Sequence, residues 1–240
     1  MMTLLNKIAL FCAITLATNA VQAAITLDRT RVIYDGQNKS ISLNISNENK
    51  QLPYLAQAWI EDAQQQKITS PLVVTPPVQR VEPGARSMVR IATAPEIAKL
   101  PQDRESLFYF NLREIPPRSE KPNVMQIALQ TKVKLFYRPQ AIAPKVGEVW
   151  QEKIVLHKTA QGYRVENPTP YYVTVIGITA KAGDKVSNEF DPVMVAPKSS
   201  AELKSGSFAA PVLTFINDYG GRPELTFSCS GDRCQFAKTV

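Results

Sequence analysis

The chain has 240 residues, of which 44% are hydrophobic and 20% are charged, a balance typical of globular proteins that bury a core. Its 28 Lys and Arg residues against 21 Asp and Glu residues give a formal charge of +7. The basic residues are mixed through the sequence and form no long block, which argues against a nucleic-acid-binding protein.

Residues 1–23 are typical of a secretory signal peptide. Lys7 gives the positive start, Ile8 to Ala17 the apolar middle, and Val21-Gln22-Ala23 the small-residue cleavage site. The apolar run is too short for a membrane span, so we expect an exported protein without membrane insertion that begins at Ala24. The mature chain then has 240 − 23 = 217 residues and, without Lys7, 27 basic against 21 acidic residues.

Short runs of alternating apolar and polar residues recur in the first half of the mature chain. Turn residues such as Pro83-Gly84 separate them, and only Glu96–Leu100 suggests a helical turn. Many short strands with Pro-rich corners predict an all-β sandwich. The expected strands are Ser40–Ser46, Tyr54–Ile60, Met88–Ala92 and Leu107–Ile115.

The segment Val124–Arg138 predicts one long alternating strand. At about 3.3 Å per residue it would be roughly 46 Å long, so part of it should extend beyond its own domain. Met125, Ile127 and Leu129 would then form an exposed apolar edge, a feature that suits pairing with another chain. The alternative is that all the odd positions from Met125 to Tyr137 face their own core, because alternation alone does not say which face is covered.

Residues Pro139–Gly147 interrupt the strand pattern and are interpreted as a linker. Segments of about 115 and 95 mature residues lie before and after it, each the size of one immunoglobulin-like sandwich. We therefore expect two such domains, at 24–141 and 142–240. Strands in the second domain are predicted at Val149–Leu156, Tyr172–Ile178, Leu213–Ile216 and Leu225–Cys229.

The sequence offers little for catalysis or metal binding. Cys12 leaves with the signal peptide, and Cys229 and Cys234 flank a Gly-Asp turn, which predicts a local hairpin disulfide in an oxidising compartment. His157 is the only histidine, so a metal site or a catalytic triad lacks partners. Nucleotide and zinc-protease motifs are absent from the sequence, and no enzyme activity or cofactor is expected.

Basic residues recur in two segments that are expected to be strands. Arg29 and Arg31 alternate near the mature N-terminus, and Lys132 and Lys134 alternate in the long strand. The ordinary interpretation is a solvated strand face. If Arg31 and Lys134 instead converged between the two sandwiches, they would form a site for a carboxylate, because charge-assisted hydrogen bonds are the stronger kind.

Several segments together resemble one protein family along nearly all of the mature chain. They are L-D-R-T-R, T-P-P-V-Q-R-V-E-P-G, L-P-Q-D-R-E-S-L-F-Y-F-N-L-R-E-I-P-P-R-S-E-K, T-K-V-K-L-F-Y-R-P, N-P-T-P-Y-Y-V-T and N-D-Y-G-G-R-P. On these residues the chain is similar to the periplasmic chaperones of the chaperone-usher pathway. The resemblance implies a boomerang of two immunoglobulin-like domains that captures pilus subunits in the periplasm, caps them by strand complementation and delivers them to an outer-membrane usher.

The resemblance also implies roles for particular residues. Arg31 and Lys134 would hold the C-terminal carboxylate of the subunit, with Thr30 beside them in the cleft. Met125, Ile127 and Leu129 would fill the groove of the incomplete subunit. The remaining implied group is a charged network that fixes the angle between the domains: Glu105, Arg138 and Asp218.

Some alternatives stay open. The three charged residues could be unrelated surface charges, and an exposed network would add orientation more than stability. Lys134 has the opposite parity to Met125, Ile127 and Leu129, so an undistorted strand would point them to opposite faces. A pilus subunit or adhesin would instead show one incomplete sandwich and an N-terminal donor extension. Whether the free protein self-associates through its apolar edge also stays open.

Overall fold

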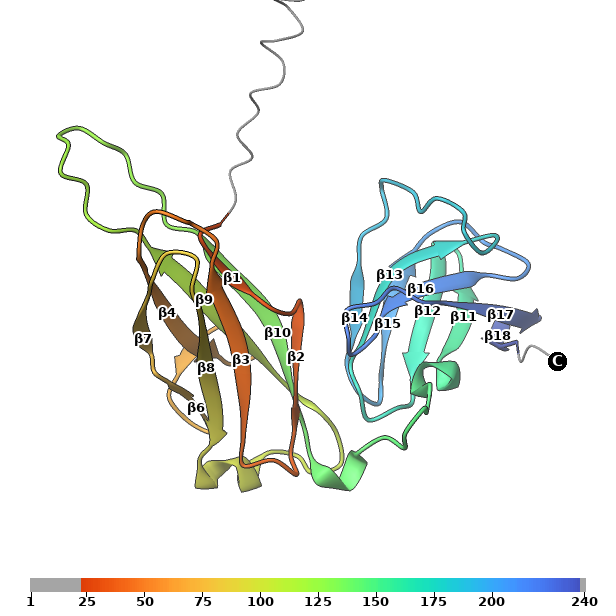
Figure 1. Cartoon of the computed structure of the whole chain (residues 1–240). Helices are drawn as coiled ribbons and strands as arrows, with labels where there is room; N and C mark the ends of the chain where they lie inside the picture. Colours follow the sequence, from red (N-terminus) through yellow and green to blue (C-terminus); the bar gives the residue numbers. More distant parts are fainter. Residues whose placement is uncertain (1–22, 238–240) are drawn as a thin grey trace, which may run out of the picture.

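The computed structural model describes residues 23–237, so the expected signal peptide lies outside the described residues except for Ala23. Two β-sandwiches are arranged as a boomerang and are joined by a short linker (Figure 1). The linker holds one 3₁₀ turn, η2 (Gln140–Ile142). The expected all-β, two-domain fold is confirmed.

The first sandwich contains two sheets. One has the strand order β1-β3-β8-β6, and the other has the order β2-β10-β9-β4-β5 with β7 paired to β4. The elements are β1 (Ile25–Leu27), β2 (Arg31–Asp35), β3 (Ser40–Asn47), β4 (Tyr54–Glu61), β5 (Lys67–Ile68), β6 (Leu72–Thr75), β7 (Val78–Val81), β8 (Arg86–Thr93), the 3₁₀ turn η1 (Pro95–Lys99), β9 (Ser106–Ile115) and β10 (Gln130–Arg138).

Alternation along these strands fills the core between the two sheets. Leu43 of β3, Ile91 of β8 and Phe110 of β9 are fully buried, and the neighbours Ser42 and Asn44 of Leu43 are exposed. The helical turn expected at Glu96–Leu100 is observed as η1, shifted by one residue.

The second domain differs from the first in that its eight strands follow one continuous ladder, in the order β14-β13-β16-β17-β18-β11-β12-β15. Its elements are η3 (Trp150–Lys153), β11 (Val155–Thr159), β12 (Gly162–Asn167), β13 (Val173–Thr179), β14 (Val193–Val195), β15 (Ser199–Lys204), β16 (Val212–Ile216), β17 (Glu224–Ser230) and β18 (Arg233–Phe236). The disulfide Cys229–Cys234 joins the directly opposed residues of the β17–β18 hairpin, which confirms the expected pairing.

The strand expected at Val149–Leu156 is wrong in its first half. Trp150–Lys153 forms a 3₁₀ turn, and β11 begins only at Val155. The run Gln151-Glu152-Lys153 has no apolar residue to continue the alternation, whereas buried Trp150 packs against Tyr171 with ring centroids 4.5 Å apart. The chain therefore turns to bury the tryptophan before the strand starts.

The N-terminal segment is two strands rather than one. Ile25–Leu27 pairs with β3 in one sheet, the chain bends at Asp28–Thr30, and β2 pairs with β10 in the other sheet. The sequence suggested that Arg29 and Arg31 alternate in a single strand. In the structure Arg29 lies in the bend, and only Arg31 belongs to β2. This change of sheet brings Arg31 alongside Lys134.

The single strand expected over Val124–Arg138 is also wrong, because β10 begins at Gln130. Continuing the Gln130–Arg113 register would place Gln126 and Ile127 opposite Pro117 and Pro116 of the neighbouring chain segment. Proline has no backbone N–H, so the ladder cannot continue there. Its last bond is donated by the Glu114 N–H to the Leu129 carbonyl, at 3.0 Å.

Candidate functional site

Arg31 and Lys134 are directly opposed residues of the parallel pair β2–β10. Both side chains are half-buried and lie on the face of the sheet opposite the core, because their neighbours Val32, Val133 and Leu135 point inward. Two like charges placed side by side repel each other, and an anion bound between them would offset this repulsion. The structure thus brings the two cations side by side on this face of the sheet.

Neither cation has an acidic ion-pair partner within residues 23–237. Arg31 donates from Nη1 to the Ile216 carbonyl of the second domain at 3.3 Å, and its buried Nε has no hydrogen-bond partner. Burial lowers the pKa of Lys134, and the neighbouring Arg31 charge lowers it further. Burial also lowers the pKa of Arg31, while the charges of Asp218 and Glu105 act against this change. Neither cation is thus neutralised by a direct ion pair, although two carboxylates act on Arg31 from a distance.

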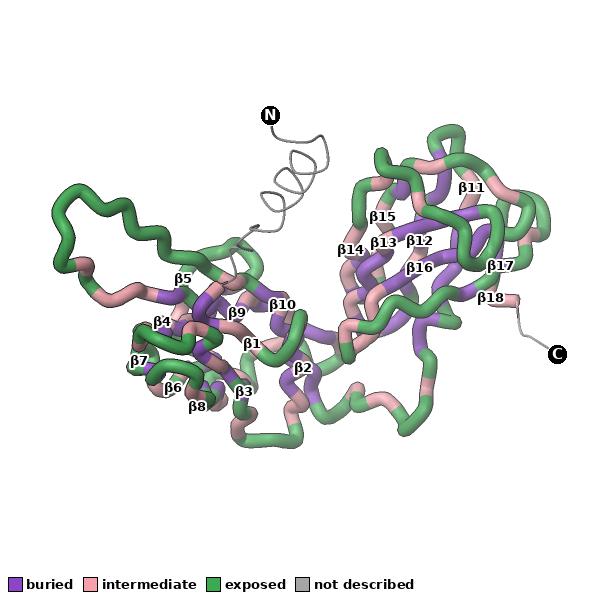
Figure 2. The backbone as a smooth tube through the Cα atoms, turned by 45° about the horizontal axis from the view of Figure 1, so that its top comes forward, coloured by how far each residue is buried: buried purple, intermediate pink, exposed green. Residues whose placement is uncertain are grey.

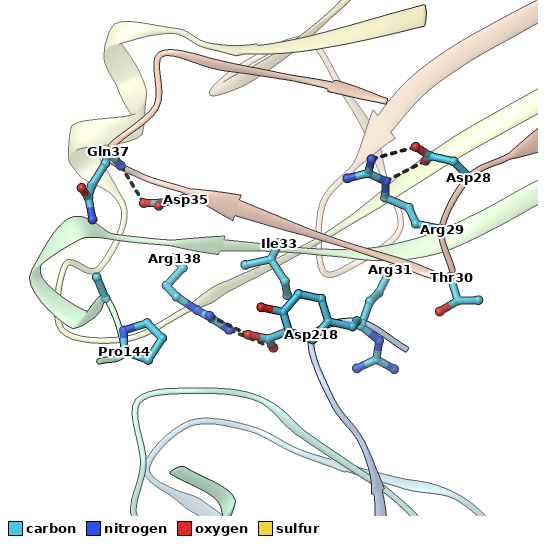
Figure 3. A pocket seen from close by; sticks show the side chains of 12 residues that line it. Asp28, Arg29, Thr30, Arg31, Ile33, Asp35, Gln37, Arg138, Pro144 and Asp218 are labelled. Atoms are coloured by element: carbon cyan, nitrogen blue, oxygen red, sulfur yellow. Dashed lines mark hydrogen bonds and ion pairs between the residues drawn. The ribbon is translucent and has the colours of Figure 1, made fainter. Parts of the chain in front are cut away.

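A cleft of about 510 Å³ lies between the two domains beside this pair. Thr30 and Arg31 line its first-domain side, and Asp218 and Tyr219 line its second-domain side (Figure 3). Lys134 stands next to Arg31 and is not itself one of the lining residues. The cleft can therefore admit a negatively charged group that approaches Arg31, although Asp28, Asp35 and Asp218 make its walls mixed in charge.

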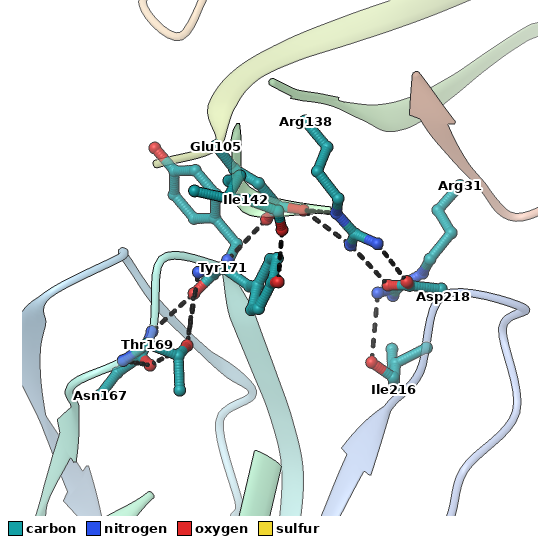
Figure 4. Close-up of polar contacts among 10 residues, drawn as sticks. Arg31, Glu105, Arg138, Ile142, Asn167, Thr169, Tyr171, Ile216 and Asp218 are labelled. Atoms are coloured by element: carbon teal, nitrogen blue, oxygen red, sulfur yellow. Dashed lines mark hydrogen bonds and ion pairs between the residues drawn. The ribbon is translucent and has the colours of Figure 1, made fainter. Parts of the chain in front are cut away.

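Glu105, Arg138 and Asp218 are in direct contact across the hinge (Figure 4). Arg138 donates from Nε to Glu105 Oε1 at 2.8 Å and from Nη1 and Nη2 to the two oxygens of Asp218 at 2.8 and 3.1 Å. Its guanidinium also lies over the Tyr171 ring, 4.8 Å from the centroid. The network joins the end of β10 to the loop after β16.

Two of the three network residues are buried, which corrects the expectation of exposed charges. The side chains of Glu105 and Arg138 are 1% and 7% exposed. Burial raises the pKa of Glu105 to about 7, although Arg138 and the Tyr172 N–H act in the opposite direction. Burial would lower the pKa of Arg138, but the hydrogen bond to Asp218 and the charge of Glu105 raise it overall. Breaking such a pair leaves an uncompensated buried charge.

Further contacts between the domains were not predicted from the sequence. The Phe136 and Tyr172 rings stack with centroids 5.3 Å apart, and the Tyr172 N–H donates to Glu105 Oε2 at 2.7 Å. Lys198 pairs with Asp103 at 2.6 Å. The Pro-Thr-Pro turn before Tyr171 and Tyr172 is the one sequence signal that could have indicated an aromatic contact at this point.

The segment from Val124 to Leu129 projects from the end of the first sandwich (Figures 1 and 2). Met125, Ile127 and Leu129 are 87%, 64% and 36% exposed. The alternative that all odd positions face the core therefore holds only for Val133, Leu135 and Tyr137. Because β2 pairs with β10 only from Lys134 onward, the outer edge of β10 is open from Gln130 to Val133. The apolar row thus continues an open strand edge.

Within residues 23–237 no group of three or more His, Cys, Asp or Glu side chains is placed to hold a metal ion. His157 contacts Glu166 at 2.6 Å on the surface of the second sandwich, far along the chain from the residues of the cleft. In the part of the chain that is described, no helix is long and apolar enough to cross a bilayer.

The fold and the site together define a two-domain binding protein with a cationic cleft and an exposed apolar strand extension. Family models describe the matching regions as the N-terminal domain of PapD, a pili and flagellar-assembly chaperone, over residues 24–143, and the C-terminal domain of the pili assembly chaperone PapD over residues 149–227. The chain belongs to this family of pilus-assembly chaperones.

Individual relatives agree with this assignment. The chaperone protein PapD of Escherichia coli is 60% identical over 98% of this chain and 99% of its own length. A crystal structure of the periplasmic chaperone SfaE has a TM-score of 0.68 and 32% identity, over 84% of this chain and 98% of its own. The SafB chaperone of Salmonella enterica, solved in complex with the SafA pilin, has a TM-score of 0.73 and 26% identity, with coverages of 88% and 98%.

Proposed function

We propose that this chaperone captures pilus subunits in the periplasm by lending them the strand that their own sandwich lacks. The observation that carries the proposal is the exposed row of Met125, Ile127 and Leu129 beside the open edge of β10. Exposed apolar edges are normally suppressed in proteins, so one in a chaperone family suits pairing with a partner strand. The relative SafB, which was solved with a pilin, supports the same class of partner.

Strand lending supplies two things that an incomplete sandwich needs. Backbone N–H and C=O groups of residues 124–133 would complete the ladder of the subunit. Met125, Ile127 and Leu129 would enter its open core and contribute up to about 1.5–3 kcal/mol each before ordering costs. A shift of one residue would turn this row to the opposite face, so the register must be fixed by something else.

Arg31 and Lys134 are proposed to fix that register by holding the C-terminal carboxylate of the subunit. An anion between them would relieve their mutual repulsion. Thr30 would lie beside it in the cleft. The two cations lie on the sheet face that points away from the core. Met125, Ile127 and Leu129 are at odd positions, like the core-facing residues of β10. The subunit would thus use its groove for the row and its chain end for the cleft.

The proposed role also includes export to the periplasm, two domains of defined limits and delivery of the subunit. Residues 1–23 would direct export, and periplasmic location is supported by the relative SfaE. The domain limits are proposed as 24–141 and 142–240, with the network of Glu105, Arg138 and Asp218 fixing the angle between the domains. Delivery to an outer-membrane usher follows from the pathway that the family serves. We propose no enzymatic step, and self-association of the free protein would use the same open edge.

Co-purification from a periplasmic extract tests the proposal. The wild-type protein should bring down a pilus subunit at a one-to-one ratio, and mass spectrometry would identify it. Ile127→Asp should lose the subunit and keep the thermal unfolding profile of the wild type, because the side chain is exposed in the free protein. A surface control, Val146→Asp, should retain the subunit. Normal capture by Ile127→Asp would refute strand lending.

A further inference from the structure

Tyr219 is a cleft residue that neither the cation pair nor the buried network uses. Its side chain is 97% exposed, and within residues 23–237 it is the only aromatic among the large exposed apolar side chains. It lines the same cleft as Thr30 and Arg31, from the second domain. A single exposed apolar residue is ordinary on a protein surface. A binding role for Tyr219 therefore has to be argued from the structure of its loop and from its position in the cleft.

The loop that carries Tyr219 is fixed by its own hydrogen bonds. Asn217 Oδ1 accepts from the backbone N–H groups of Tyr219 at 3.1 Å and Gly221 at 2.8 Å. The Asn217 N–H donates to the Gly221 carbonyl, and the neighbouring Asp218 is held by Arg138. The backbone at Tyr219 is thus in place before a partner binds, so that only the rotations of its side chain have to be ordered on binding.

Gly220 shows how closely this loop approaches the first domain. A Cβ atom at Gly220 would lie 2.5 Å from Thr30 Oγ1, and its φ of +83° is a conformation that favours glycine. The loop therefore touches the residue next to Arg31. Tyr219 is one residue away from this contact and lines the same cleft as Arg31.

We propose that Tyr219 determines specificity in subunit capture, by packing its ring against an apolar side chain near the subunit's C-terminal carboxylate. This proposal rests on the proposed function. Two cations recognise a chain end but no particular side chain, because every chain ends in a carboxylate. An exposed aromatic ring beside them adds a contact that depends on the side chain, and aromatic residues are enriched at protein interfaces.

The test uses the full-length chaperone and the subunit that co-purifies with it. Tyr219→Ala should weaken the complex by about tenfold, a typical loss for one aromatic interface contact. Tyr219→Phe keeps the ring and should stay within about twofold of wild type. The matched control is Val146→Ala, which removes another fully exposed apolar side chain outside the lining of the cleft. Unchanged thermal unfolding of each variant excludes a folding defect.

A second arm identifies the contact on the subunit. In a subunit variant whose apolar residues among the last three positions are changed to Ser, Tyr219→Ala should have less than a twofold effect. An undiminished tenfold loss would place the contact elsewhere and overturn the proposal. Wild-type affinity of Tyr219→Ala, with capture lost in Arg31→Ala, would also overturn it while leaving the proposed function intact. Normal capture by Arg31→Ala and Lys134→Ala would instead refute the carboxylate anchors.

Discussion

The two halves of the 124–138 segment carry the same alternating pattern but lie in different surroundings. Val133, Leu135 and Tyr137 are packed in the core of the first sandwich, whereas Met125 and Ile127 are exposed. The difference comes from the neighbouring chain: β9 pairs with the second half, and Pro116 and Pro117 follow β9 where the first half would pair. Alternation thus marks a face that can be buried, and the partner strand decides whether it is.

The same contrast holds for the charged residues of β10. Lys134 and Arg138 have the same parity and face the same side of the sheet. Arg138 is buried between two carboxylates, while Lys134 faces another cation. One charge therefore serves the structure of the free protein, and the other is available to a partner.

The largest expected effect separates the two halves of the segment. Leu135→Asp should destabilise the first domain by at least about 5 kcal/mol, because it places a charge in a fully buried core position. Ile127→Asp should change the free energy of unfolding by less than about 0.5 kcal/mol, as at an ordinary surface site. Denaturant unfolding of the free chaperone measures both. Comparable destabilisation by the two variants would contradict the assignment of Leu135 to the core and of Ile127 to the surface.

Removal of Arg138 should have the next largest effect. Arg138→Ala leaves Glu105 buried without its cation, which costs about 3–5 kcal/mol. The loss should be accompanied by a wider distribution of interdomain angles, measured by small-angle scattering. Asp103→Ala, which breaks the exposed pair with Lys198, is the control and should cost at most about 1 kcal/mol. Equal costs for the two variants would count against a structural role of the buried network.

The buried Glu105 also predicts a dependence of stability on pH. Its pKa is raised from 4.5 to about 7 in the folded protein, so between these values the folded state binds more protons than the unfolded state. The free energy of unfolding should therefore fall as pH rises from 4.5 through 7, by up to about 3 kcal/mol, and then level off. Glu105→Gln should lose this contribution. Identical pH profiles in wild type and Glu105→Gln would contradict it.

Lys134 should have the smallest effect on the free protein. Lys134→Ala removes one of two adjacent cations that lack an acidic partner, so the free energy of unfolding should stay the same or rise slightly. Subunit capture should weaken by about 10- to 100-fold, as expected for the loss of a charge-assisted hydrogen bond of about 1.5–3 kcal/mol. A marked loss of stability with capture retained would assign Lys134 to the fold rather than to the site.

The sequence predicted the features that depend on local pattern. Strand runs such as Ser40–Ser46, the linker after Arg138 and the Cys229–Cys234 hairpin follow from alternation, prolines and cysteine spacing. It did not predict the bend at Asp28–Thr30 or the end of β10 at Gln130, because both depend on which strand is the neighbour. Pro116 and Pro117 explain why β10 begins only at Gln130, but this inference requires the register of β10 against β9.

The site was predicted less completely than the fold. The named site residues came from a resemblance, and their burial could not be inferred from it: Glu105 and Arg138 were expected on the surface and are buried. Contacts such as Phe136 with Tyr172 join residues far apart in sequence, so no local pattern indicates them. The close approach of Gly220 to Thr30 likewise depends on how the two domains meet.

Amide hydrogen exchange of residues 124–129, with and without the co-purified subunit, tests strand lending most directly. These amides are outside the β10 ladder in the free protein and should exchange rapidly. In the complex they should be protected by at least about 100-fold, as in a paired strand. Slow exchange in the free protein, or rapid exchange in the complex, would contradict the account.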